Sequence, residues 1–277
     1  MVEIVFDKNL SHAFGHMNNR GLNLFKIIAN QNATIVINKE LMEYFSEEVS
    51  TIEIKEKWEA LILELAHNNR IKATKRVLNK LDSEEVYQNA SIANNNAVFI
   101  LKDAIATMPH HIPLLSNNLS DQIVHDIAST NKFNLTGIDF NTNDEIDSFF
   151  CRLFTCMPSS NRIIVVSRYA NFDCNFISCL NSHYQKKEYW TLKNTHDLSN
   201  NKAFVQKKLG NQLKHFFVRT KKDLHERRII INSMILSFDN DFINIEANKE
   251  TWACQCEINR DKARKFRESK NLIEIFH

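Results

Sequence analysis

Short β-rich runs alternate with amphipathic helical stretches along most of the chain, and this alternation limits the fold more than any other feature. The first half has β-rich runs at 2–6, 33–38 and 97–101. Between them, apolar residues recur every three or four positions, and 53–81 is predicted to form two amphipathic helices. Because strands separated by helices usually form parallel sheets, the sequence predicts a parallel α/β sheet in this half.

The second half continues the alternation and then changes to a different pattern. Strands predicted at 162–167 and 188–192 flank a helix around 172–184. Further on, short β-rich runs are joined by polar turns, which predicts a β-meander followed by a basic helix beginning at Asp261. The strands expected in this part are 215–219, 227–231, 234–238, 242–246 and 251–258.

Charge changes along the chain together with the pattern. Residues 1–140 hold 17 acidic and 13 basic side chains, whereas residues 141–277 hold 16 acidic and 22 basic ones. A basic excess favours a polyanionic partner. We therefore expect two α/β domains, 1–135 and 136–277, with nucleic acid as the partner of the second.

Composition excludes several classes of protein. With only four glycines, the chain has no glycine-rich phosphate loop of the kind that nucleotide-dependent motors and dehydrogenases use. The six cysteines lack zinc-type spacing and no signal peptide is evident, so reduced thiols in the cytoplasm are expected. No apolar run approaches the roughly 18 residues that span a membrane. The sequence therefore predicts a soluble cytoplasmic protein without a membrane partner.

Acidic residues follow the strands and head the helices of the first half. Asp7 follows the first β-rich run, Asp103 follows 97–101, Glu43 lies in the helix after the second run, and Glu85 heads a later helix. In a parallel sheet these positions share one edge. Carboxylates that meet there can hold Mg²⁺ or Mn²⁺, which activates a water for attack on a phosphodiester. Helix caps or solvated positions are the alternative for the two glutamates.

The segments that carry these carboxylates are IVFDKN, IVINKELMEYF and EEVYQNASIANNNAVFILKD. Their order resembles that of the motifs in PIN-domain nucleases. The resemblance implies a site that cleaves RNA or DNA, with four metal-binding residues: Asp7, Glu43, Glu85 and Asp103. The chain departs from the family where Lys102 stands at a position usually held by Thr or Ser, and an inactive PIN-like module is an open alternative.

A basic segment at 207–232 is the strongest nucleic-acid signal of the second half, because cations there are interleaved with Phe216 and Phe217. The alternative places both rings in the core. An arginine after the strand 162–167 could hold a further phosphate. The residues predicted to bind phosphate are Arg168, Lys221, Lys222, Arg227 and Arg228.

His225, Arg227 and Asn232 have the spacing of the phospholipase D motif, which is a His, one residue, a Lys, four residues and an Asp. Residues 160–260 resemble the phospholipase D-like domain found in some MIT-domain proteins and in bacterial defence proteins. The resemblance implies that His225 is a catalytic nucleophile. Such histidines work in pairs, and this chain has one copy of the motif, so a homo-oligomer would have to supply the second.

These patterns together predict a metal-dependent nuclease, with RNA favoured over DNA, acting in a bacterial antiphage or toxin system. Two alternatives stay open. One is a metal-independent phosphodiesterase that uses His225. The other is a non-catalytic subunit that binds nucleic acid or a partner protein of a defence system.

Overall fold

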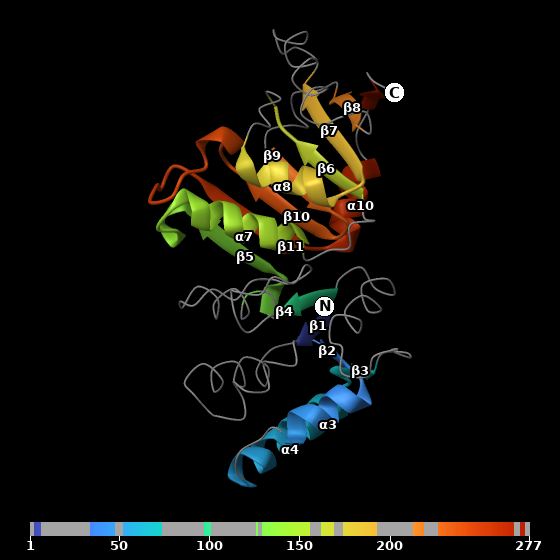
Figure 1. The fold of residues 1–277 in the computed structure, drawn as a ribbon. Coiled ribbons are helices and arrows are strands. Elements are labelled where there is room, and N and C mark those ends of the chain that lie inside the picture. The colour runs from blue at the N-terminus through green and yellow to red at the C-terminus, as the bar shows by residue number, and fades with distance from the viewer. Residues whose placement is uncertain are drawn as a thin grey trace. The chain divides into compact units, whose positions relative to one another are not determined.

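The computed structural model divides the chain into two compact units, Met1–Phe133 and Asn134–His277, and each is described by itself (Figure 1). Each unit contains a β-sheet and helices, so the α/β class predicted from the alternation is confirmed. The structure describes residues 3–6, 34–47, 52–73, 97–100, 126, 129–155, 162–168, 174–192, 213–218, 227–268 and 272–274.

The first unit contains a four-stranded sheet in the order β3-β2-β1-β4, and all of its pairings are parallel. The parallel sheet predicted for this half is therefore confirmed. Its strands are β1 (Glu3–Phe6), β2 (Thr34–Ile37), β3 (Ile71–Ala73) and β4 (Ala97–Ile100), and its helices are α3 (Lys39–Glu47) and α4 (Ile52–His67).

Helix α4 packs through one face. Trp58, Leu61 and Leu65 are buried and lie three and four positions apart, which is the spacing of a helix face. Of the two helices predicted within 53–81, the structure describes one, α4; residues 74–81 lie outside the described residues, so the second helix stays a prediction. The chain leaves α4 through Asn69, whose φ of 54° is left-handed, and residues 71–73 form strand β3.

The second unit contains an eight-stranded sheet in the order β12-β8-β7-β6-β9-β10-β11-β5. β6, β7 and β8 are mutually parallel, whereas β9, β10 and β11 form an antiparallel meander. The strands are β5 (Lys132–Thr136), β6 (Arg162–Val166), β7 (Lys186–Leu192), β8 (Leu213–Val218), β9 (Arg227–Ile231), β10 (Met234–Phe238), β11 (Ala253–Ile258) and β12 (Leu272–Glu274).

The predicted meander is partly correct. β9, β10 and β11 pair as expected, but 242–246 is not a strand, because Phe242–Asn244 forms the 3₁₀ helix η3. The strand predicted at 215–219 is β8, which is not part of the meander because it pairs in parallel with β7. Strand β5 was not predicted at all.

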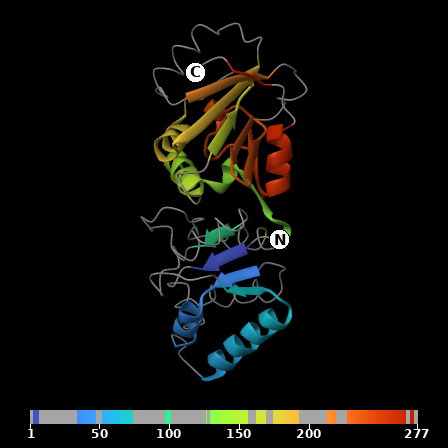
Figure 2. The same cartoon turned by 90° about the vertical axis from the view of Figure 1, so that its right-hand side faces the viewer.

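Helices cover both faces of the large sheet (Figure 2). α7 (Asn143–Thr155) and α8 (Asn175–His183) lie on one face, and α10 (Arg260–Glu268) lies on the other. Strand β6 is buried from Ile163 to Val166, as expected for a central strand between two helical layers. None of the described helices has the length and hydropathy needed to span a membrane.

Different side chains fill the two layers. On the α7 side, Phe150 is the centre of an aromatic cluster, with ring centroids 5.0 Å from Phe176 and 5.5 Å from Phe238. On the α10 side, the rings of Trp190 and Phe266 stack at 5.7 Å. The apolar residues packed around that pair are Ile164, Val166, Ile230, Ile235 and Ala263. Each face of the sheet therefore has its own core.

Gly137 begins the 3₁₀ helix η1 (Gly137–Asp139), where the chain passes under the β10–β11 connection. A Cβ there would lie 2.2 Å from the Lys249 carbonyl oxygen and 2.6 Å from that of Glu246. We expect Gly137→Ala to lower the free energy of unfolding by about 1–3 kcal/mol, because backbone atoms would have to move. Urea unfolding measures this change.

The neighbouring Ile138 provides a control for Gly137→Ala, because its side chain is 61% exposed. Ile138→Ala should change the free energy of unfolding by no more than about 0.5 kcal/mol. Equal urea midpoints for wild type and Gly137→Ala would contradict the close approach of the two backbone segments.

Candidate functional site

The residues predicted as functional fall into two groups. Glu43, Arg168, Arg227 and Arg228 belong to the part of the chain that the structure describes. The others lie outside the described residues, and their predictions stay predictions: Asp7, Glu85, Asp103, Lys221, Lys222 and His225.

The carboxyl edge of the first sheet is defined by strand register. Phe6, the last residue of β1, pairs with Ile100, the last residue of β4, so the two strands end level with each other. In the sequence, Asp7 comes directly after β1 and Asp103 comes three residues after β4. Two of the predicted carboxylates therefore follow neighbouring strands from the same edge of the sheet.

Helix α3 begins at this same edge. Asn38, which separates β2 from α3, is buried, and its carbonyl accepts the amide N–H of Met42 at 3.1 Å. Glu43 lies one turn into the helix, where its exposed carboxylate pairs with Lys39 Nζ at 3.3 Å. Among the described residues, no three His, Cys, Asp or Glu side chains form a group that could hold a metal ion. Glu43 is thus the only member of the predicted ligand set that the structure describes.

In the second unit, three strand ends meet at one edge of the large sheet. Val166 at the end of β6 pairs with Arg228 in β9, and Phe238 at the end of β10 pairs with Arg227. The residues that continue from these ends are Ser167 and Arg168 after β6, and Asp239, Asn240 and Asp241 after β10. We call this set, with Arg227, the β6–β9–β10 edge.

Arg227 and Arg228 lie on opposite faces of the sheet. Arg227 pairs across the strands with Phe238, which contacts Phe150 of α7, so it lies on the α7 side. The guanidinium carbon of Arg228 lies 4.8 Å from the ring centroid of Phe266 in α10, so Arg228 lies on the other side. Arg227 and Arg228 therefore belong to separate surfaces, although both were predicted to bind phosphate.

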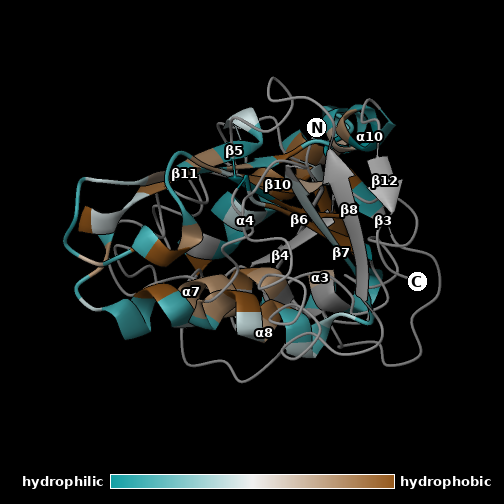
Figure 3. Ribbon diagram, turned by 90° about the horizontal axis from the view of Figure 1, so that it is seen from above, coloured by the Kyte–Doolittle hydropathy of each residue, from teal (hydrophilic) through white to brown (hydrophobic). Residues whose placement is uncertain are grey.

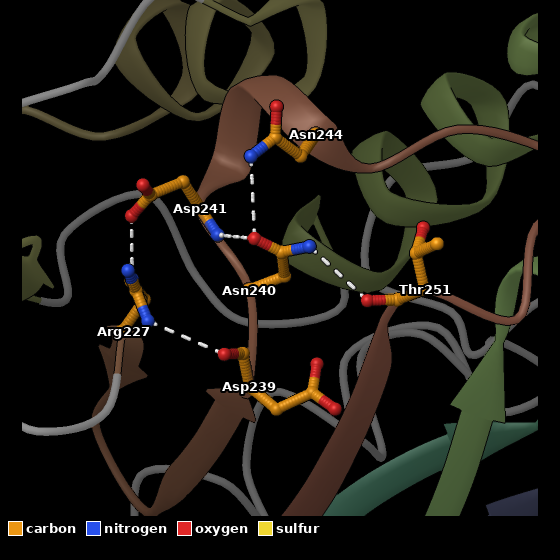
Figure 4. Close-up of polar contacts among 6 residues, drawn as sticks. All are labelled: Arg227, Asp239, Asn240, Asp241, Asn244 and Thr251. Carbon is orange, nitrogen blue, oxygen red and sulfur yellow. Dashed lines mark hydrogen bonds and ion pairs between the residues drawn. The ribbon is translucent and has the colours of Figure 1, made fainter.

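Arg227 is fixed by acidic and carbonyl oxygens (Figure 4). Its Nε donates to Asp241 Oδ1 at 2.5 Å, and its Nη1 donates to the carbonyl oxygen of Asp239 at 3.2 Å. The two side chains of the ion pair are only 15% and 16% exposed. Such a charge-assisted contact away from solvent fixes the direction of the guanidinium. It also pairs Arg227 with Asp241, a residue that was not predicted to be functional.

Asn240 organises the turn next to this ion pair (Figure 4). Its Oδ1 accepts the backbone N–H of Asp241 at 2.8 Å, and its Nδ2 donates to the Thr251 carbonyl at 3.1 Å. Asp239 Oδ1 accepts the N–H of Ala253 at 2.7 Å. The polar residues after β10 therefore join the two ends of the β10–β11 connection. Polar residues directly after an apolar strand are the sequence signal that could have identified them.

Ser167 provides a buried polar atom at the β6–β9–β10 edge. Its side chain is fully buried, and its N–H donates to the Trp190 carbonyl at 3.1 Å. Within the described ranges, no group hydrogen-bonds to Ser167 Oγ. A buried hydroxyl without a partner costs about 1–3 kcal/mol, so such atoms usually bind a water or a ligand. Arg168, the next residue, is half-buried.

Asn232, the third residue of the phospholipase D-like spacing, lies far from this edge. It occupies the turn between β9 and β10 with a left-handed φ of 54°, and its carbonyl accepts Arg267 Nη2 at 3.1 Å. The five residues of β9 separate it from the edge by about 16 Å. Arg227 and Asn232 therefore do not share one site within this chain.

Comparison with known proteins gives distant structural likenesses. No protein-family model matches the sequence, and no curated protein matches it. The chain is similar to Nuc, a phospholipase D family member from Salmonella typhimurium, at 11% identity and a TM-score of 0.39, covering 53% of this chain and 99% of that one. It is also similar to NucT from Helicobacter pylori, at 11% identity and a TM-score of 0.35, covering 50% and 91%.

A third similar structure is the archaeal chromatin protein TrmBL2, at 12% identity and a TM-score of 0.31, covering 78% of this chain and 65% of that one. All three TM-scores are below 0.5, so these likenesses do not define the activity of this chain. The argument for function depends on the two sheet edges described above.

Proposed function

We propose that the chain is a nuclease that hydrolyses RNA or DNA phosphodiesters with Mg²⁺ or Mn²⁺ bound at the carboxyl edge of the first sheet. Asp7 and Asp103 bind the cation, and Glu43 and Glu85 bind it or orient the attacking water. On the family resemblances of the sequence, this nuclease acts in a bacterial defence or toxin system.

The main support for this proposal is that β1 and β4 are neighbouring parallel strands whose last residues pair with each other. Neighbouring strands lie about 4.8 Å apart, so the segments that carry Asp7 and Asp103 start side by side at this edge, and the proposal assigns both carboxylates to one cation. Helix α3 starts at the same edge and presents Glu43 one turn later. The ion pair of Glu43 with Lys39 is exposed, and such pairs contribute at most about 1 kcal/mol. Its carboxylate can therefore exchange Lys39 for a metal ion at little cost.

A second candidate function is metal-independent phosphodiester hydrolysis with His225 as the nucleophile. The β6–β9–β10 edge favours it, because His225 precedes Arg227 by two residues in the sequence. The same edge holds Arg168, whose half-buried guanidinium is a cation that could contact a phosphate there. The ion pair of Arg227 with Asp241 argues for a positioning role rather than direct phosphate binding.

Removal of divalent cations separates the two functions. We expect cleavage of end-labelled single-stranded RNA or DNA in Mn²⁺, and loss of cleavage in EDTA, because the proposed nucleophile is a metal-activated water. His225→Ala should cleave at the wild-type rate. The amount and length of the products over time on a sequencing gel measure the loss of cleavage in EDTA and the rate of His225→Ala.

Two results would contradict the metal-dependent proposal. Cleavage that persists in EDTA and disappears in His225→Ala would establish the second candidate instead. No cleavage of either nucleic acid in Mn²⁺ would leave a non-catalytic binding subunit as the remaining function.

A further inference from the structure

We propose that single-stranded nucleic acid binds in a cleft beside α10, on the face of the large sheet opposite α7 and α8. The choice of nucleic acid as the ligand rests on the proposed function. The binding surface itself is new, because it involves neither the metal site nor the ion pair of Arg227.

The cleft has a volume of about 350 Å³ and lies where α10 leaves the sheet uncovered. Six of its nine lining residues are polar or charged, and they include two cations, two amides and a hydroxyl. These side chains are Arg228, Lys262, Asn134, Gln255 and Ser237.

Strand register explains why these side chains line up. Ser237 of β10 pairs with Arg228 on one side and with Gln255 on the other, so the three lie in one row across the sheet. Gln255 Nε2 donates to Asn134 Oδ1 at 3.2 Å, which extends the row to β5. Along β9 and β10 the next residues on this face, Ile230 and Ile235, pack under α10. The row therefore lies just beyond the covered core, and its two amide side chains are exposed.

Helix α10 supplies the positive charge beside this row, and Figure 3 shows the helix as mostly hydrophilic. Its acidic residues are Asp261 and Glu268, and its five basic residues are Arg260, Lys262, Arg264, Lys265 and Arg267. Four of these basic side chains are exposed. The field of the helix therefore attracts more than one phosphate.

The two cations of the cleft are held in position. Lys262 Nζ pairs with the buried carboxylate of Glu257, and Arg228 lies over the ring of Phe266, which stacks on Trp190. A cation that is already oriented loses less conformational entropy when a phosphate binds. Asp239 is the one acidic residue of the lining, and its Oδ1 accepts a backbone N–H from Ala253. The cleft therefore has N–H donors that suit an anion, and the excess of positive charge beside it comes from α10.

Size and position favour a single strand over a duplex. A volume of about 350 Å³ lies near the lower end of the roughly 300–1,000 Å³ of small-ligand pockets, so the cleft suits one nucleotide unit and is too small to enclose a double helix. Two residues that line the cleft connect it to the β6–β9–β10 edge. Asp239 belongs to that edge, and Phe238 is the last residue of β10 before it. A nucleic-acid strand that leaves the cleft in this direction reaches the β6–β9–β10 edge.

Gln255→Glu tests the cleft with a nearly isosteric change. It adds a carboxylate to the exposed centre of the row, and we expect about tenfold weaker binding of an end-labelled single-stranded oligonucleotide. The slope of the logarithm of the binding constant against the logarithm of salt concentration is negative. It should become shallower by about 0.7, as for one lost phosphate contact. Fluorescence anisotropy in EDTA measures both without cleavage, so the result does not depend on the metal-dependent activity.

Two further variants sharpen the test. Asn134→Asp makes the same charge change on β5 and should weaken binding to a similar extent. Gln185→Glu is the matched control, because Gln185 is exposed and precedes β7 at the opposite edge of the sheet. Wild-type affinity in both cleft variants, equal losses in all three variants, or tighter binding of duplex than of single strand would overturn the proposal.

Discussion

Asp7→Asn is expected to lower divalent-dependent cleavage by about 100-fold or more while the protein stays folded. An amide has no negative charge to offset the cation, and losses of this size are typical when one charge-stabilising group is removed from a catalytic site. Asp7 is the residue that follows β1, whose end is level with that of β4, and so it has a central place in the proposed metal site. Single-turnover cleavage rates in Mn²⁺ measure the effect.

Asp144→Asn serves as the matched control for this variant. Asp144 is an exposed residue in the first turn of α7, so the same charge change there should leave the rate within about twofold of wild type. Circular dichroism verifies that both variants are folded. Undiminished cleavage by Asp7→Asn would remove this residue from the catalytic site.

Phe150→Ala should lower the free energy of unfolding of the second unit by about 3–5 kcal/mol. The side chain is fully buried, and its ring contacts those of Phe149, Phe154, Phe176 and Phe238 at centroid distances of 5.0 to 5.9 Å. Removing it leaves a cavity between α7 and the sheet that these rings cannot fill, because β10 and α8 hold two of them. Urea unfolding followed by far-UV circular dichroism measures the loss.

Ile243→Ala controls for the loss of an apolar side chain in the same unit. Ile243 is 50% exposed in η3, so its removal should change the free energy of unfolding by less than about 1 kcal/mol. Similar losses in Phe150→Ala and Ile243→Ala would contradict the central place of Phe150 in the core.

Strands with continuous β-branched residues could be predicted from sequence, since they are apolar on both faces. RIIVV at 162–166 is such a run, and four of its residues are fully buried as strand β6. Strands that depend on pairing with a distant segment could not be predicted in this way. β5 has only five residues with two buried side chains, and it depends on β11, whose residues lie some 120 positions later in the sequence. Non-local pairing of this kind leaves no local pattern.

Side-chain hydrogen bonds account for the wrong strand at 242–246. From Ile243 on, the run FINIE alternates apolar and polar residues as a strand does. However, Asn240 bonds to Asp241 and Asn244, and Asp241 pairs with Arg227, which together favour a tight turn. In the same way, the end of α4 depends on the left-handed φ of Asn69 rather than on a glycine or proline. Asparagine was therefore the breaking signal that periodicity alone did not detect.

The candidate sites were predictable only where residues flank a strand. Arg168, Arg227 and Arg228 adjoin apolar runs, and they lie at or beside one edge of the large sheet. Ser167 and Gln255 were not identified, because the role of each depends on which residues face it across neighbouring strands. Cross-strand register is set by the whole sheet, and a single sequence does not display it.

The position of β5 beside β11 has a kinetic consequence. The hairpins β9–β10 and β10–β11 join residues close in sequence, so they can form with little loss of chain entropy. The contact between Gln255 and Asn134 closes a loop of 121 residues, which is slow to form. We therefore expect the meander and α10 to form early in folding. Strand β5 and the turn at Gly137 should join the sheet late. Damage to the late contacts should act mainly by speeding unfolding, because they contribute little to the transition state.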